Sequence, residues 1–143
     1  MKIAIGSDHA GFGLKEIIKS YLQLKGIELI DVGTYSEERA DYADYAHLVA
    51  QHVENKQVDL GILMCGSGNG INMAANKHKG IRSALCWTAE IAELARLHNN
   101  ANILTLPARF ISEEEAKKCV DVFIATAFEG GRHSDRVKKI SNC

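Results

Sequence analysis

The stretch DLGILMCGSGNG, residues 59–70, decides the fold that we expect for this chain. Its first half is a continuous apolar run with the length of a strand, and such runs are typical of strands covered on both faces of a sheet. Its second half is rich in glycine and opens a helix that we expect to reach about Lys77. A buried strand that leads directly into a helix is the building unit of a parallel α/β sheet.

The same alternation of strand and helix continues on both sides of this stretch. Apolar residues recur at helical spacing after the first strand, for example at Leu14, Ile18 and Leu22, and a capping box pairs Ser112 with Glu115 before the last long helix. We expect strands at residues 2–7, 28–32, 59–64, 81–87 and 102–106. The sequence therefore predicts an α/β fold of three layers, in which helices cover both faces of a five-stranded parallel sheet in a single domain, residues 1–143.

Composition narrows the classes of function. The 17 basic and 18 acidic residues give a net charge of −1, so nothing indicates a basic surface for nucleic acid or a membrane. No apolar run reaches the roughly 18 residues of a membrane span, and the apolar start of the chain is too short for a secretory signal. We therefore expect a cytoplasmic protein that binds neither nucleic acid nor a membrane.

The four cysteines, Cys65, Cys86, Cys119 and Cys143, lie far apart in the sequence. None belongs to a C-x-x-C pair or has a histidine at zinc-finger spacing, so we expect neither a disulfide framework nor a structural metal site. Cys86 and Cys119 lie in apolar patterns and are expected to be buried thiols. Cys65 is different, because it ends a buried strand immediately before the glycine-rich turn.

Ligands of parallel α/β sheets bind beyond the carboxyl ends of the strands, and the glycine-rich turn at residues 66–70 lies there. Its glycines permit a close approach of the backbone, and the start of a helix supplies free N–H groups. The dinucleotide fingerprint and the Walker A loop both fail at Ile71. The turn is therefore either a cradle for an anion or oxyanion with a thiol at its mouth, or a tight turn beside a packed cysteine.

Three further groups of residues each have a functional and a purely structural interpretation. Asp8 and His9 follow the first strand, where Asp8 either contacts a ligand or caps the next helix. His98 ends an apolar helix stripe, as a site residue or as a buried structural histidine. Arg132 and Arg136 are one helical turn apart, and they form either a solvated basic face or a phosphate clamp.

Five motifs, spread in order over essentially the whole chain, carry a resemblance to a known family. They are SDHAG at 7–11, CGSGNG at 65–70, AANK at 74–77, HNNA at 98–101 and GGRH at 130–133. Together they resemble the sugar-phosphate isomerase family that includes type B ribose-5-phosphate isomerases and the galactose-6-phosphate isomerase subunits of the lactose pathway. The resemblance implies a Rossmann-like fold and interconversion of ribose 5-phosphate and ribulose 5-phosphate, with no metal or organic cofactor.

The resemblance also implies roles for individual residues. Cys65 resembles the general base that moves a proton between C2 and C1, and His98 resembles the acid that helps to open the furanose ring. The enediolate oxygens would be held by the Ser67 hydroxyl and by the backbone N–H groups of Gly66, Ser67, Gly68, Asn69 and Gly70. The other implied site residues are Asp8 and Asn99 for the sugar hydroxyls, and His9, Arg109, Arg132 and Arg136 for the phosphate. The family pattern further implies a homodimer, or a dimer of dimers, with shared active sites and with the terminal helix, about residues 131–140, packed on the partner.

The sequence departs from the family pattern in one respect that bears on the base. The turn GSGNG resembles another branch of the family, in which a glutamate just after the loop is the base, but Ile71 stands there and cannot ionise. Cys65 therefore remains the expected base. Two alternatives stay open: an allose 6-phosphate or galactose 6-phosphate isomerase, and a non-catalytic module that binds sugar phosphates and would need neither Cys65 nor His98.

Overall fold

Five parallel strands form one sheet in the order β2-β1-β3-β5-β4, in a computed structural model that describes residues 1–143. The strands are β1 (Lys2–Ser7), β2 (Glu28–Asp31), β3 (Leu60–Cys65), β4 (Ser83–Leu85) and β5 (Ile103–Pro107). The apolar run after Asp59 is β3, and all six of its residues are buried because it lies at the centre of the sheet. The prediction of a three-layer α/β fold with a five-stranded parallel sheet is confirmed.

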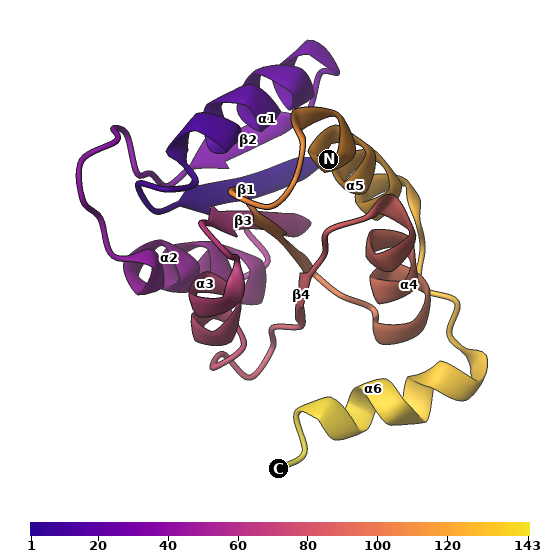
Figure 1. Ribbon diagram of the computed structural model, residues 1–143. Coiled ribbons are helices and arrows are strands. Elements are labelled where there is room, and N and C mark those ends of the chain that lie inside the picture. The colour runs from indigo at the N-terminus through magenta and orange to yellow at the C-terminus, as the bar shows by residue number, and fades with distance from the viewer.

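Helices cover both faces of the sheet (Figure 1). One face carries α1 (Phe12–Leu24), α4 (Ala89–Asn99) and α5 (Glu113–Ala125), and the other carries α2 (Tyr42–Glu54) and α3 (Asn69–Ala75). Successive residues of a strand point to opposite faces, so the central strands supply both cores. Ile62 and Met64 pack with the first set of helices, whereas Leu63 packs with the second.

Three local predictions were wrong, two of them because side chains take hydrogen bonds that the patterns assigned elsewhere. The fourth strand is shorter than residues 81–87, since the N–H of Arg82 donates to Asn102 Oδ1 and that of Ser83 to Asn76 Oδ1, both at 2.8 Å. The capping box is half formed: Ser112 Oγ accepts from the N–H of Glu115, but Glu115 accepts from the N–H of Ala89 and so ties α5 to α4. The third helix ends at Ala75, two residues before its expected end.

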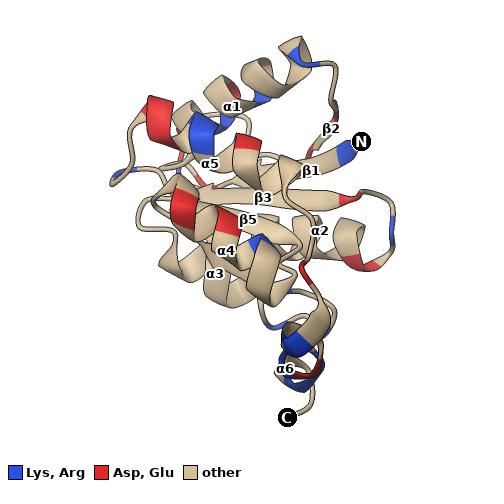
Figure 2. Ribbon diagram, turned by 90° about the vertical axis from the view of Figure 1, so that its right-hand side faces the viewer, with Lys and Arg blue, Asp and Glu red and all other residues tan.

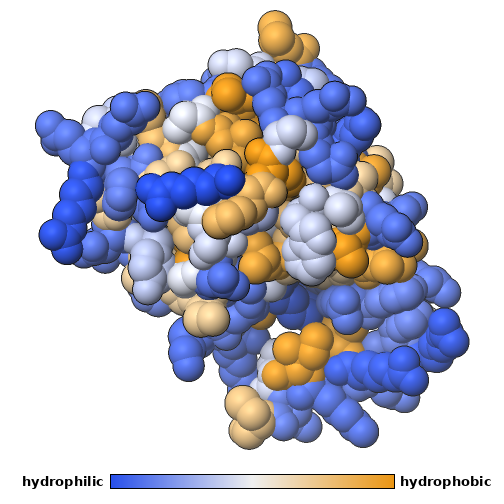
Figure 3. Space-filling view, viewed as in Figure 1, coloured by the Kyte–Doolittle hydropathy of each residue, from blue (hydrophilic) through white to orange (hydrophobic).

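The chain ends outside this body. A short 3₁₀ helix, η1 (Gly131–His133), leads into α6 (Ser134–Ile140), which projects away from the sheet in Figures 1 and 2 and contains no buried residue. Basic residues colour much of the α6 ribbon blue in Figure 2, and Figure 3 shows hydrophobic residues exposed in the same region. Ser141, just beyond α6, donates to the carbonyl oxygen of Lys79 at 2.8 Å.

None of the helices is both long enough and apolar enough to cross a membrane.

Candidate active site

The order of the strands places the first and third strands at the point where the connections change direction. β1 pairs with β2 on one side and with β3 on the other, and the chain returns across β1 to build the second half of the sheet. At such a switch point the connecting segments diverge and leave room for a ligand beyond the carboxyl ends. The end of β3 brings Cys65 to this edge, and the segments that follow β1 and β5 bring Asp8 and Arg109.

Cys65 is the last residue of β3, and its side chain is buried at this edge. The segment after β5 is bonded to it, because the N–H of Ala108 donates to the carbonyl oxygen of Cys65 and the N–H of Arg109 to that of Gly66, both at 2.9 Å. The Arg109 side chain lies against Gly66, where an added Cβ would be 3.3 Å from a guanidinium nitrogen. The thiol, the glycine-rich turn and a cation therefore occupy one site.

The turn after Cys65 requires glycine at two positions. Gly68 has φ +79°, and a Cβ there would lie 2.4 Å from Leu85 Cδ1. A Cβ on Gly70 would lie 2.5 Å from the ring of Tyr42. The N–H groups of Gly66, Ser67 and Gly68 donate to no group of the protein. Three free donors beside a thiol give the turn the chemistry of an oxyanion cradle.

Ser67 and Asn69 shape the turn from within. Ser67 Oγ accepts from the backbone N–H and from the side-chain amide of Asn69, each at 3.3 Å. A hydroxyl that accepts two hydrogen bonds still has its own proton to donate, so Ser67 can contact a substrate oxygen. An apolar wall adjoins the turn, where Ser67 and Asn69 line a pocket with Leu85, Trp87, Pro107 and Phe110. Trp87 and Phe110 are 54% and 74% exposed, which is unusual for such large apolar side chains at a polar site.

Asp8 and His9 lie beside the end of the first strand and are both held by the backbone. Asp8 Oδ1 accepts from the N–H of Gly11 at 3.0 Å, which makes a turn just before α1 rather than a helix cap. One carboxylate oxygen of the buried Asp8 therefore remains for a ligand. The His9 ring nitrogen Nδ1 lies 3.2 Å from both the N and the O atom of Ala40, so the loop before α2 orients the imidazole.

His98 and Asn99 lie at the other edge of the sheet. Helix α4 begins after the carboxyl end of β4 and runs back, so its last turn lies near the start of β5. With a rise of about 1.5 Å per residue, His98 is about 14 Å along the helix axis from Ala89. Asn99 accordingly lines a pocket with the residues at the amino end of β4, Arg82 and Ser83. One chain therefore does not bring His98 and Asn99 to the thiol.

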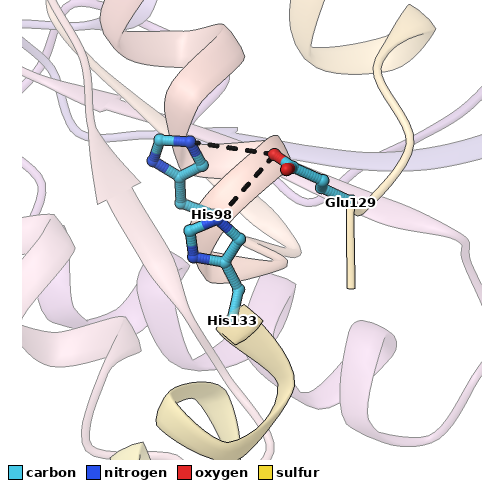
Figure 4. A group of neighbouring side chains, drawn as sticks. All are labelled: His98, Glu129 and His133. Atoms are coloured by element: carbon cyan, nitrogen blue, oxygen red, sulfur yellow. Dashed lines mark ion pairs between the residues drawn. The ribbon is translucent and has the colours of Figure 1, made fainter. Parts of the chain in front are cut away.

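His98 has its own neighbours at this second edge (Figure 4). Its ring stacks on that of His133 with the centroids 4.4 Å apart and the planes at 16°. Glu129 Oε2 lies 3.9 Å from Nε2 of His98 and 3.8 Å from Nε2 of His133. His98 is half-exposed rather than a packed structural histidine, whereas His133 is buried and its Nε2 has no hydrogen-bond partner.

These three side chains also form the group that could hold a metal ion, since their ligand atoms lie within 4.8 Å of one another. The arrangement fits a metal poorly. Zinc binds histidine nitrogen and carboxylate oxygen at about 2.0–2.2 Å, so neighbouring ligand atoms are roughly 3.3–3.5 Å apart. The lone pair of an imidazole lies in the ring plane, and two nearly parallel stacked rings do not direct both lone pairs to one ion. The geometry suits an ionic contact better.

Burial and charge act strongly on three groups of the chain. The pKa of His133 is lowered by burial first and then by the charges of His98, Arg132 and Arg136, whereas the charge of Glu129 raises it. Burial raises the pKa of the Cys86 and Cys119 thiols to about 12, so these two cysteines stay protonated. Both are free and buried, as the sequence predicted.

The two arginines of the expected phosphate clamp belong neither to the site around Cys65 nor to the group of His98, Glu129 and His133 within one chain. Arg132 lies in η1 and not in α6 as expected, Arg136 lies in α6, and both are exposed. Sequence reasoning missed Glu129, which no motif or periodicity marks. Its place depends on the return of the chain after α5, where the N–H of Glu129 donates to the carbonyl oxygen of Leu97 at 3.1 Å.

A parallel sheet with a buried thiol and free N–H donors at its carboxyl edge defines the class: an α/β protein whose site has an ionisable thiol, donors that can hold an oxyanion, and room for a small polar substrate. Comparisons with known proteins identify the family. Residues 3–140 match the family model described as Ribose/Galactose Isomerase. Ribose-5-phosphate isomerase B of Escherichia coli (strain K12) is 48% identical over 140 residues, which cover 98% of this chain and 94% of that protein.

Solved structures agree with the sequence comparison. The crystal structure of a ribose 5-phosphate isomerase from Thermotoga maritima is 56% identical, with a TM-score of 0.98 and coverage of 99% of this chain and 98% of that one. Ribose-5-phosphate isomerase B from Mycoplasma genitalium, with bound ribulose-5-phosphate, is 48% identical with a TM-score of 0.93, over 99% of this chain and 94% of that one. The chain belongs to the ribose/galactose isomerase family, and it is an aldose–ketose isomerase.

Proposed function

We propose that this chain interconverts ribose 5-phosphate and ribulose 5-phosphate. The observation that carries the proposal is the site at the carboxyl edge of the sheet, where the Cys65 thiol lies beside three free N–H donors. A similar chain of known structure, from Mycoplasma genitalium, holds ribulose-5-phosphate, and it matches 99% of this chain. The substrate has five carbons and one phosphate, which fits a small polar site.

The reaction needs a base and a stabilised oxyanion, and the site supplies both. In the open-chain aldose, the Cys65 thiolate removes the proton from C2, the C1=C2 double bond forms, and negative charge moves to the C1 oxygen. The N–H groups of residues 66–70 and the Ser67 hydroxyl hold the enediolate oxygens at that moment. The proton then returns from the thiol to C1, and the proton of the C2 hydroxyl moves to O1, which leaves the ketone at C2. Each fixed donor of this kind typically contributes about 2.7–4 kcal/mol to the transition state.

The remaining residues bind the sugar and its phosphate. We assign Asp8 and Asn99 to the sugar hydroxyls, and His9, Arg109, Arg132 and Arg136 to the phosphate. His98 gives a proton to the ring oxygen when the furanose opens. Asp8 has a free carboxylate oxygen and Arg109 lies against the turn, which supports their part of the assignment.

The position of His98 implies that two subunits build each site. His98 and Asn99 lie about 14 Å along α4 from the edge that carries Cys65, so a second copy of the chain must bring its own α4 to that edge. Three features support a homodimer or a dimer of dimers: α6 has no buried residue, its arginines face solvent, and Trp87 and Phe110 are exposed beside the turn. Residues 1–143 form one sugar-phosphate isomerase domain, with residues 131–140 packed on the partner. Its free cysteines suit the reducing cytoplasm.

A coupled isomerase assay tests the proposal with ribose 5-phosphate, allose 6-phosphate and galactose 6-phosphate side by side. We expect the highest kcat/KM with ribose 5-phosphate, and Cys65→Ala should remove nearly all turnover while binding of the sugar phosphate persists. Cys143→Ala is the matched control, because Cys143 is exposed at the chain end. A preference for galactose 6-phosphate would assign the hexose activity that the family description also covers. Binding without turnover in the wild type would indicate a binding module.

A further inference from the structure

The carboxylate of Glu129 lies beside two stacked imidazoles, and the proposed function gives it no role. It is 3.9 Å from His98 Nε2 and 3.8 Å from His133 Nε2, and the same oxygen, Oε2, faces both rings (Figure 4). The three residues come from different segments: the last turn of α4, the return after α5, and η1. An equal approach to two nitrogens indicates that the carboxylate serves the pair and not one ring alone.

Two hydrogen bonds place the main chain of Glu129 beside the end of α4. Arg96 Nε donates to the carbonyl oxygen of Thr126 at 3.0 Å, and the N–H of Glu129 donates to that of Leu97 at 3.1 Å. These two bonds hold the segment after α5 against the last turn of α4. Gly130, with φ +71°, then reverses the chain so that the His133 ring comes back against His98.

The surroundings allow one positive charge on the two rings. Rings stacked at 4.4 Å repel each other if both are protonated, and Arg132 and Arg136 add further positive charge. Glu129 is the acidic group that opposes this effect. Burial disfavours the charged form of His133 in particular, and its Nε2 has no hydrogen-bond partner, whereas the His98 ring is half-exposed to solvent.

We propose that Glu129 is a positioning residue that orients both imidazoles and holds one proton on the pair, so that His98 is ready to act as an acid. The role in catalysis rests on the proposed function, in which His98 opens the furanose. That step breaks the bond between C1 and the ring oxygen, moves one proton to the ring oxygen, and removes one from the C1 hydroxyl. A protonated His98 beside the neutral His133 provides the first of these protons without requiring a second charge at the site.

Proton NMR of the imidazole Cε1–H signals tests the proposal in the full-length apoprotein. We expect His133 to titrate at lower pH in Glu129→Gln than in the wild type, with the midpoint partly restored in Glu129→Asp. Glu93→Gln is the control, because Glu93 is an exposed carboxylate on α4, the helix that also contains His98, and it is not in contact with the two imidazoles. Unchanged midpoints in Glu129→Gln would overturn the proposal. Glu129 is half-exposed, so loss of the fold is not expected, and circular dichroism checks it.

Pre-steady-state ring opening of ribose 5-phosphate gives the second readout. In Glu129→Gln we expect the rate at pH 7.5 to fall by about tenfold or more, and its pH profile to move toward lower pH, with KM within about twofold of the wild type. A shifted titration with an unchanged ring-opening rate would overturn the proposal as well. A wild-type protein without isomerase activity would instead refute the proposed function, and the titration would still decide whether Glu129 holds the proton.

Discussion

Subunit exchange between two inactive variants tests the shared site directly. Cys65→Ala lacks the proposed base, and His98→Asn lacks the proposed ring-opening acid. Within one chain, Cys65 ends β3 at the carboxyl edge, whereas His98 lies at the end of α4 near the amino edge. β5 lies between β3 and β4, and α4 itself separates the two edges by about 14 Å. A single chain therefore cannot present both side chains to one five-carbon sugar.

The expected recovery follows from the symmetry of a dimer. Random exchange of equal amounts makes about half of the dimers heterodimers, and each of these contains one site with both residues intact and one with neither. The mixture should therefore regain about a quarter of the wild-type activity, while each variant alone retains less than about 1%. The assay is coupled isomerase turnover after the mixed chains are unfolded and refolded, with heterodimers counted by native mass spectrometry. If heterodimers form and activity stays at the level of the separate variants, the base and the acid act within one chain.

Two further predictions concern stability. Gly11→Ala should lower the free energy of unfolding in urea by about 1–3 kcal/mol, because the new Cβ would lie 2.4 Å from the Met64 carbonyl oxygen. The control is Gly13→Ala, whose new Cβ would have nothing within 4 Å and should not lower the free energy of unfolding. Equal free energies of unfolding for the two variants would contradict the packing of α1 on β3. Burial raises the pKa values of the Cys86 and Cys119 thiols from the usual 9.0 to about 12, so they stay protonated in the folded state at a pH where the thiols of the unfolded chain have ionised. The free energy of unfolding should therefore fall between pH 9 and 11 by up to about 1.4 kcal/mol per pH unit for each thiol. If the stability of a Cys86→Ala/Cys119→Ala variant falls equally steeply over this range, the prediction is wrong.

The fold was predictable because its signals are local. The apolar run 59–64 and the helical spacing of Ile18 and Leu22 identify elements that need no knowledge of their neighbours. The errors occur where distant side chains compete for backbone groups. Asn76 and Asn102 take N–H donors at the start of the fourth strand, and Glu115 bonds to Ala89 across 26 residues instead of closing its own cap.

The two halves of the candidate site differ in the same way. The residues at the carboxyl edge could be named in advance, because parallel strands all end at that edge, where Cys65 ends β3 and Asp8 directly follows β1. The cluster of His98, Glu129 and His133 depends instead on how the segment after α5 folds back onto α4, which the sequence pattern does not encode. The resemblance to a family pointed to His98, but it gave no role to the carboxylate beside it.

The last prediction concerns a buried ion pair that supports the end of the site to which we assign the phosphate. The Lys15 side chain is fully buried, and its Nζ lies 2.7 Å from both carboxylate oxygens of Asp31. Burial acts to raise the pKa of Asp31, but hydrogen bonds from Lys15, Lys19 and the N–H of Gly33 outweigh it, and the pKa is lowered from 3.8. The stabilisation from Asp31 is therefore present above about pH 3.8 and is lost as the pH falls through the lower folded value.

Lys15→Met removes the buried cation and leaves the Asp31 carboxylate with Lys19 as its one cation, beside the N–H of Gly33. Breaking one partner of such a pair costs about 3–5 kcal/mol, and the lower end applies because Lys19 remains 2.9 Å away. Lys19→Met is the matched control, and since Lys19 is more exposed it should cost at most about 1 kcal/mol in urea unfolding at pH 7. Asp31 also accepts a hydrogen bond from the N–H of Gly33, which begins the loop that reaches Ala40 and its contact with His9. We therefore expect Lys15→Met to raise KM for the sugar phosphate more than it lowers kcat. Equal stability of the two variants would show that Lys15 does not hold this corner of the fold, and an unchanged KM would separate the ion pair from the site.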